Sequence, residues 1–133
     1  MQIRLASVMV EDQEKALRFY TEVLGFIKDK DIPMGPFRWL TVNSPEGAVG
    51  VELVLEPMAF PPAKTYQSAL FAAGIPATAF LTGDITAEFK RLKERGVVFR
   101  GEPQNMGPIT AVLFEDNCGN LINLVQPAIL KTV

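Results

Sequence analysis

Histidine is absent from the 133-residue chain, and Cys118 is its single cysteine. Because imidazole is the commonest metal ligand and a frequent general base, its absence removes most familiar catalytic arrangements. A thiolate nucleophile needs a neighbouring base or cation, so without a histidine we do not expect Cys118 to be catalytic. The remaining chemistry is that of carboxylates, and an all-oxygen metal site would draw on Glu52, Glu56, Glu115 and Asp116. We expect Glu115 and Asp116 to be solvated in a turn-rich segment, so the sequence does not favour a metal site.

Composition and charge indicate one globular domain over residues 1–133. The chain has 13 basic and 15 acidic residues, a net charge of −2, and 48% hydrophobic residues. This near-balance gives no electrostatic basis for binding nucleic acid or an anionic membrane. No apolar run is long enough to span a bilayer, and the N-terminal segment lacks the apolar core of a signal peptide. A single cysteine forms no intrachain disulfide, which favours a cytoplasmic location.

The chain contains an internal repeat. Met34-Gly35-Pro36 recurs as Met106-Gly107-Pro108, and Asp12 recurs as Asp84 at the same offset. Each aspartate ends a short apolar run and precedes a segment of helical periodicity, as an N-cap does. The Gly-Pro pairs predict equivalent turns, each before a long strand.

Both halves of the repeat are predicted to fold as βαβββ modules. Module one spans about residues 1–57, a linker about 58–76, and module two about 77–127. In the linker we expect Pro61-Pro62 to break the chain, and the stretch that follows favours a short helix ending at Gly74. The expected elements of module one are strand Ile3–Val10, helix Gln13–Leu24 and strands Phe26–Asp29, Arg38–Asn43 and Gly50–Leu55; those of module two are strand Thr78–Thr82, helix Ile85–Arg95 and strands Val97–Arg100, Thr110–Glu115 and Leu121–Gln126.

Two segments carry a family resemblance. The stretch VEDQEKALRFYTEVLGF is similar to the signature that runs from first strand to second strand in the vicinal-oxygen-chelate superfamily, and EDNCGNLINLVQP resembles its closing hairpin. That superfamily includes glyoxalase I, bleomycin-resistance proteins and extradiol dioxygenases. The resemblance covers nearly the whole chain except the linker. It implies an α+β fold in which each βαβββ module curls its sheet into a half-open cup, and two facing modules enclose a cavity.

The resemblance also implies where a metal would be held. Metal-dependent members bind a divalent ion through two histidines and one or two glutamates. Leu5 and Ala77 occupy the two histidine positions here, Asn123 occupies the last glutamate position, and Glu52 matches the remaining one. Leucine and alanine have no lone pair to donate, and one amide oxygen with one carboxylate falls far short of a divalent ligand set. We therefore expect no metal and no other cofactor.

Strand alternation predicts which side chains line the cup. The wall is mostly apolar, which suits a small organic ligand better than a hydrated ion. A carboxylate on such a wall has a raised pKa unless it is paired, so Glu52 is a candidate base or cation contact; the alternative is a structural ion pair with Arg4 or Arg38. Trp39 is expected either to pack in the core or to offer an aromatic wall to a planar or cationic ligand. The expected ligand-binding residues are Leu5, Ser7, Met9, Trp39, Glu52, Glu56, Ala77, Ala79 and Asn123.

Two functions from different classes remain open. A third interpretation is that the chain is a degenerate member of the superfamily that acts through protein contacts. The first is a metal-free protein, similar to the bleomycin-resistance branch, that binds a small, mostly apolar or cationic organic ligand. The second is an enzyme of the same superfamily, of lyase, isomerase or dioxygenase type, that uses Glu52 as a base or a metal held by carboxylates. The expected partners are the small-molecule ligand and a second copy of the chain, because a homodimer would cover exposed sheet edges and helix faces. The sequence does not name the ligand.

Overall fold

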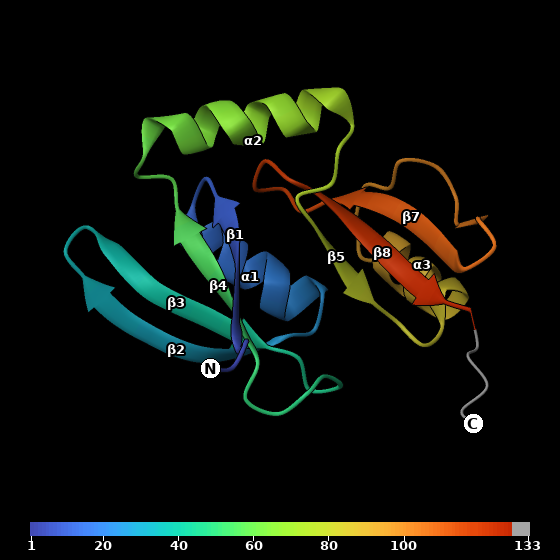
Figure 1. The fold of residues 1–133 in the computed structure, drawn as a ribbon, viewed down its shortest axis with the longest axis horizontal. Helices are drawn as coiled ribbons and strands as arrows, with labels where there is room; N and C mark the ends of the chain where they lie inside the picture. The colour runs from blue at the N-terminus through green and yellow to red at the C-terminus, as the bar shows by residue number, and fades with distance from the viewer. Residues whose placement is uncertain (129–133) are drawn as a thin grey trace.

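Two four-stranded mixed sheets form the framework of the computed structural model, which describes residues 1–128 (Figure 1). The strand order is β1-β4-β3-β2 in the first sheet and β5-β8-β7-β6 in the second. In each sheet the first and last strands of the module run parallel, and the other neighbours run antiparallel. This confirms the α+β fold built from two half-open βαβββ modules. The elements are β1 (Leu5–Val10), α1 (Gln13–Arg18), η1 (Phe19–Val23), β2 (Ile27–Met34), β3 (Phe37–Asn43), β4 (Glu52–Pro57), α2 (Pro61–Ala73), β5 (Thr78–Leu81), α3 (Ile85–Glu94), β6 (Gln104–Asn105), β7 (Ile109–Glu115) and β8 (Leu121–Pro127).

Both predicted N-caps are confirmed. The carboxylate of Asp12 accepts a hydrogen bond from the amide of Lys15 at 3.0 Å, and that of Asp84 accepts one from Ala87 at 3.1 Å. Each carboxylate thereby satisfies an amide that the first turn of a helix leaves free. The two repeated Gly-Pro turns are also confirmed, because Gly35 and Gly107 have φ values of 61° and 92° and each joins two antiparallel strands.

Module two lacks the expected strand Val97–Arg100. That segment makes only an isolated bridge, from Phe99 to Phe114, and the strand beside β7 is the later pair Gln104–Asn105. Two backbone hydrogen bonds flank the bridge, from Arg100 to Leu113 at 2.8 Å and from Glu115 to Val98 at 2.9 Å. Phe99 also contacts the rings of Phe89 and Phe114, so both interactions place the segment.

The linker helix is longer than expected. Pro61 and Pro62 begin α2 instead of breaking the segment. Proline is tolerated in the first helical turn, where its missing N–H would have no intrahelical partner. In module one the helix changes hydrogen-bond pattern at Phe19, whose carbonyl accepts from the amide of Leu24 in a π-type turn. Strand β2 also runs further than expected, to Met34.

One hydrophobic core joins the two modules. It contains helix-facing residues of the first sheet, such as Val8 and Leu40, and helix-facing residues of the second, such as Ile122 and Leu124. Figure 1 shows α1 between the two sheets and α2 crossing above both. The sheet faces opposite the helices, here called the cup faces, therefore do not take part in this shared core. Within residues 1–128, no helix has the length and apolar character needed to cross a bilayer.

Candidate functional site

The cup face of the first sheet is set by strand alternation. Val8 and Val10 of β1 point into the core, so Leu5, Ser7 and Met9 point to the other face. Parallel pairing places these three opposite Glu52, Val54 and Glu56 of β4, respectively. Ser7 and Glu56 lie within reach of each other, with Oγ and Oε1 3.5 Å apart. The structure thus brings together the site residues predicted on β1 and β4.

Glu52 lies at the centre of this face as half of an ion pair. Its Oε1 is 2.7 Å from Nζ of Lys30, and it accepts a second hydrogen bond at 2.7 Å from the hydroxyl of Thr41. The hydrogen bond from Lys30, followed by that from Thr41, lowers the pKa of Glu52 below its ordinary value. Glu52 is therefore paired, and its partner is Lys30.

The side chains of the two arginines predicted as alternative partners of Glu52 bind other residues instead. Arg38 sits on the helix side of β3 and pairs with Asp31 at 2.7 Å and Glu14 at 2.9 Å. Arg4 donates to the side chain of Gln2. Alternation explains the placement of Arg38, because Leu40, two positions along the same strand, faces the core.

A register shift explains how Lys30 reaches Glu52. The pairing of β2 with β3 is irregular between Lys28 and Asp31, as at a β-bulge. The backbone amide of Lys30 there donates to the hydroxyl of Thr41 at 3.0 Å, which anchors the lysine over the cup face. The predicted strand Phe26–Asp29 ended one residue before Lys30, so Lys30 was missed, although it alternates with Ile32 and Met34.

Apolar side chains dominate the outer part of the same face. Trp39 pairs across the ladder with Ile32, and Phe37 pairs with Met34. Ile32, Met34 and Phe37 are 50%, 58% and 39% exposed, and Leu5 is 51% exposed. Ile32, Met34 and Phe37 escaped sequence analysis, although their alternation with Trp39 and the core residue Leu40 is a usable signal.

The remaining predicted residues belong to the second sheet. Ala79 of β5 pairs with Asn123 of β8, and both point away from the core. Ala77 precedes β5 and donates its amide to the carbonyl of Leu121. A hollow of about 230 Å³ beside β1 and β5 is lined by both Glu52 and Ala79, so the two sets approach each other there. The shared core keeps the two cup faces from closing over a common cavity within one chain.

The residues at the superfamily's metal positions do not fit a metal. Leu5 and Ala77 have no donor atoms, Asn123 has one neutral carbonyl, and Glu52 is occupied by Lys30. Among the described residues, no group of three or more aspartate, glutamate or cysteine side chains is arranged to hold an ion. No metal-dependent step is derived for this chain.

Asp116 differs from the expectation of a solvated carboxylate, because it is fully buried. It accepts hydrogen bonds from the hydroxyl of Tyr20 at 2.7 Å, from the amides of Cys118 and Asn120, and from the side-chain amide of Asn120. Four donors balance the buried charge. Gln67 of α2 joins the same network through Asn120, so Asp116 links both modules and the linker helix. It is a structural residue rather than a metal ligand.

Glu115 is half-buried and pairs with Arg100, with 3.2 Å between the guanidinium and the carboxylate. The thiol of Cys118 is fully buried. Burial, followed by the charge of Asp116, raises the pKa of Cys118 to about 12. The structure therefore agrees with the expectation that Cys118 is not a nucleophile.

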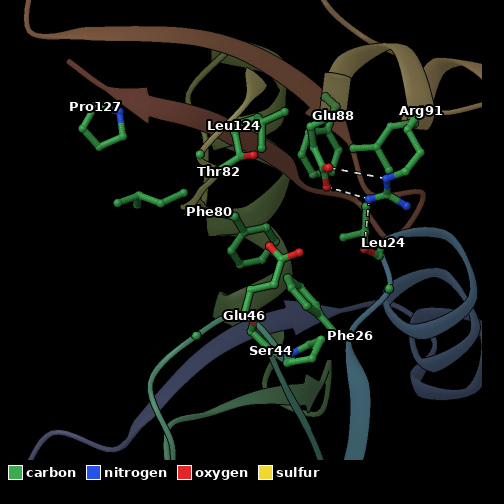
Figure 2. Close-up of a pocket in the computed structure, with 17 residues that line it drawn as sticks. Leu24, Phe26, Ser44, Glu46, Phe80, Thr82, Glu88, Arg91, Leu124 and Pro127 are labelled. Atoms are coloured by element: carbon green, nitrogen blue, oxygen red, sulfur yellow. Dashed lines mark hydrogen bonds and ion pairs between the residues drawn. The ribbon is translucent and has the colours of Figure 1, made fainter. Parts of the chain in front are cut away.

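A second hollow of about 600 Å³ lies between the modules (Figure 2). It is lined by Phe26 and Phe80 and by the ion pair of Glu88 with Arg91. None of the predicted ligand-binding residues lines it. We call it the junction cavity.

Comparisons with known proteins agree with the geometry. The sequence model described as Glyoxalase/Bleomycin resistance protein/Dioxygenase superfamily matches residues 2–124. The uncharacterized protein YurT of Bacillus subtilis (strain 168) is 54% identical over 126 residues, which span 95% of this chain and 99% of YurT. The crystal structure of TnmS3, an antibiotic binding protein from Streptomyces sp. CB03234, has a TM-score of 0.75 and 37% identity, covering 96% of this chain and 97% of TnmS3. That of UcmS2 has a TM-score of 0.80 and 30% identity, covering 94% and 97% of the two chains.

Proposed function

The chain belongs to the Glyoxalase/Bleomycin resistance protein/Dioxygenase superfamily, and we propose that it binds a small, mostly apolar organic ligand on its cup faces without a metal. The observation that carries this proposal is the group of exposed apolar side chains beside Trp39, namely Ile32, Met34 and Phe37. A contiguous exposed apolar surface is typical of a binding site. The likeness to a protein described as antibiotic-binding supports the same class of function.

The polar centre of the cup favours a neutral ligand. Glu52 is compensated by Lys30, so the face offers hydrogen bonds to a polar substituent without a large net charge. A carboxylate whose pKa is lowered is a weak base, which argues against an enzyme that uses Glu52 for proton abstraction. A binding protein is therefore the better account of this site.

The proposed cavity is completed by a second copy of the chain. Within one chain the two cup faces do not close over a common space, and each presents only one wall. Small-molecule sites bury most of the ligand's surface, so one open face is insufficient. A homodimer that brings two cup faces together supplies the missing wall. The free cysteine accords with a cytoplasmic location, which we propose as well.

Binding is tested with the neutral fluorophore N-phenyl-1-naphthylamine, whose emission rises in apolar surroundings. Because Trp39 is the single tryptophan and lies on the cup face, energy transfer from it to the probe reports binding, and the variants below assign the binding to that face. Ile32→Asp places a charge among the apolar side chains beside Trp39 and should weaken probe binding roughly tenfold or more. Ile75→Asp is the matched control, since Ile75 is similarly exposed (49%) but lies beyond α2.

The proposal fails if Ile32→Asp and Ile75→Asp bind the probe equally well, or if the probe binds without energy transfer from Trp39. Light scattering at micromolar concentration tests the second copy, and a monomer that still binds at the cup would refute the shared cavity. Turnover of a methylglyoxal–glutathione hemithioacetal by purified, metal-free protein would refute the choice of a binding protein over an enzyme.

A further inference from the structure

The junction cavity lies on the opposite side of the sheets from the cup faces. Its apolar wall includes Leu24, Leu92, Phe114 and Leu124, which all belong to the core that joins the modules. It opens beside the loop between β3 and β4, at the end of the junction remote from α2 (Figure 1). Its volume of about 600 Å³ lies within the range of small-molecule sites, roughly 300–1,000 Å³. A ligand here would contact both modules of one chain.

Two aromatic rings from different modules form one wall of the cavity. Phe26 follows the first helix, and Phe80 belongs to β5. Their centroids are 5.2 Å apart with an interplanar angle of 89°, and Tyr20 contacts both rings from the core side. This edge-to-face packing fixes the ring positions, so the wall is preformed for an aromatic or other flat apolar body.

The charged groups at the cavity differ in whether they have a partner of opposite charge. Arg91 binds Glu88 at 2.6 Å and also donates to the carbonyl of Leu24, so both partners of this pair are engaged. Glu46, in the loop between β3 and β4, makes no side-chain hydrogen bond or ion pair to any other residue within 1–128. Figure 2 shows its carboxylate in front of Phe80 and directed into the hollow. The cavity therefore combines a fixed aromatic wall with one uncompensated carboxylate.

We propose that the junction cavity is a second ligand site, which takes a small organic cation with an aromatic body. The body packs against Phe26 and Phe80, and the cationic group lies beside Glu46. Carboxylate and aromatic faces both attract an ammonium group, whereas an anion would meet the unpaired charge of Glu46. None of the residues predicted to bind ligand on the cup faces lines this site, although it shares Phe26 and Phe80 with the smaller hollow beside β1 and β5.

Three probes with a common phenyl group test the proposal: 2-phenylethylamine, 2-phenylethanol and 3-phenylpropanoate. Each is titrated into ¹⁵N-labelled full-length protein at neutral pH and low salt. We expect amide shifts at Phe26, Glu46 and Phe80 but not at Leu5 or Trp39. The amine should bind up to about fivefold more tightly than the alcohol, as for an exposed ion pair, and the acid more weakly than either.

Two test variants and one control distinguish the contribution of the charge from that of the cavity. Glu46→Gln should remove the preference for the amine, while Glu94→Gln, at an exposed position on α3, should retain it. Ser44→Phe fills the hollow from the β3–β4 loop and should weaken all three probes.

Equal affinity for the three probes overturns the proposal, as do shifts confined to the cup face and an absence of shifts at millimolar probe. Retention of the amine preference in Glu46→Gln also overturns it. The outcome is separable from the proposed function, because cup-face binding is read from the loss of affinity in Ile32→Asp, whereas junction binding is read from amide shifts at Phe26, Glu46 and Phe80.

Discussion

Tyr20→Phe is expected to lower the free energy of unfolding, and the structure sets limits on the size of this effect. Tyr20 is fully buried in the first helix, and its hydroxyl donates at 2.7 Å to the buried carboxylate of Asp116 at the closing hairpin of the other module. Burial, followed by the negative charge of Asp116, raises the pKa of Tyr20 well above its ordinary value, so the hydroxyl stays protonated as the donor. The substitution removes this donor and leaves the ring packing in place.

The expected loss of unfolding free energy follows from the hydrogen bond that Tyr20→Phe removes. A hydrogen bond to a charged group contributes about 1.5–3 kcal/mol, and Asp116 would remain buried with three donors instead of four. Against a typical domain stability of about 5–15 kcal/mol, that loss is a large fraction. Asp116→Asn should cost roughly as much or more, because the new NH₂ group would face the side-chain NH₂ of Asn120.

Urea unfolding followed by circular dichroism measures both effects as changes in the free energy of unfolding. The chain offers a matched control in Tyr66→Phe, since Tyr66 is 66% exposed on α2 and should be indifferent to the loss of its hydroxyl. If Tyr20→Phe and Tyr66→Phe unfold at the same urea concentration with the same slope, the buried network does not hold the modules together and the reasoning is wrong.

Three other outcomes are expected. Above pH 9 the native state should lose stability, because the unfolded thiol of Cys118 ionises near its ordinary pKa of 9.0 whereas the folded thiol, with a pKa of about 12, stays protonated. The loss is about 1.4 kcal/mol at pH 10, and Cys118→Ala should flatten the slope of urea midpoint against pH between 9 and 10; an unchanged slope would contradict this. The triple variant Leu5→His, Ala77→His, Asn123→Glu should acquire affinity for Zn²⁺ or Ni²⁺ in calorimetric titration, and failure to do so would show that these positions are misaligned with the superfamily's metal site. Glu52→Gln should leave the melting temperature nearly unchanged, because glutamine keeps an acceptor for Thr41 and the side chain of Lys30 is 46% exposed and stays solvated, and it should shift cup-face affinity toward anionic probes; a large drop in melting temperature would assign Glu52 a structural role instead.

Local signals in the sequence predicted the fold better than they predicted the site. The caps at Asp12 and Asp84 and the turns at Gly35 and Gly107 depend on residues within a few positions of each other, so the sequence shows them directly. The burial of Asp116 depends on Tyr20, which lies in the other module. A turn-rich segment normally indicates solvent exposure, and only the packing of one module on the other reverses it.

Spacing carries only part of the information about the partner of Glu52. Counted back from Ile32 and Met34, alternation places Lys30 on the cup face, but counted forward from Ile27 it places Lys30 on the helix side, because the irregular pairing between Lys28 and Asp31 resets the face. The bulge has an electrostatic consequence. With Leu5 at a position where metal-dependent relatives hold a histidine, Glu52 would otherwise be an uncompensated charge on an apolar wall, and such a charge is costly to cover with an apolar ligand. Lys30 supplies the positive charge from within the chain. The charge of Glu52 is thereby balanced by Lys30, which supports the proposal of an uncharged, mostly apolar ligand over a hydrated ion.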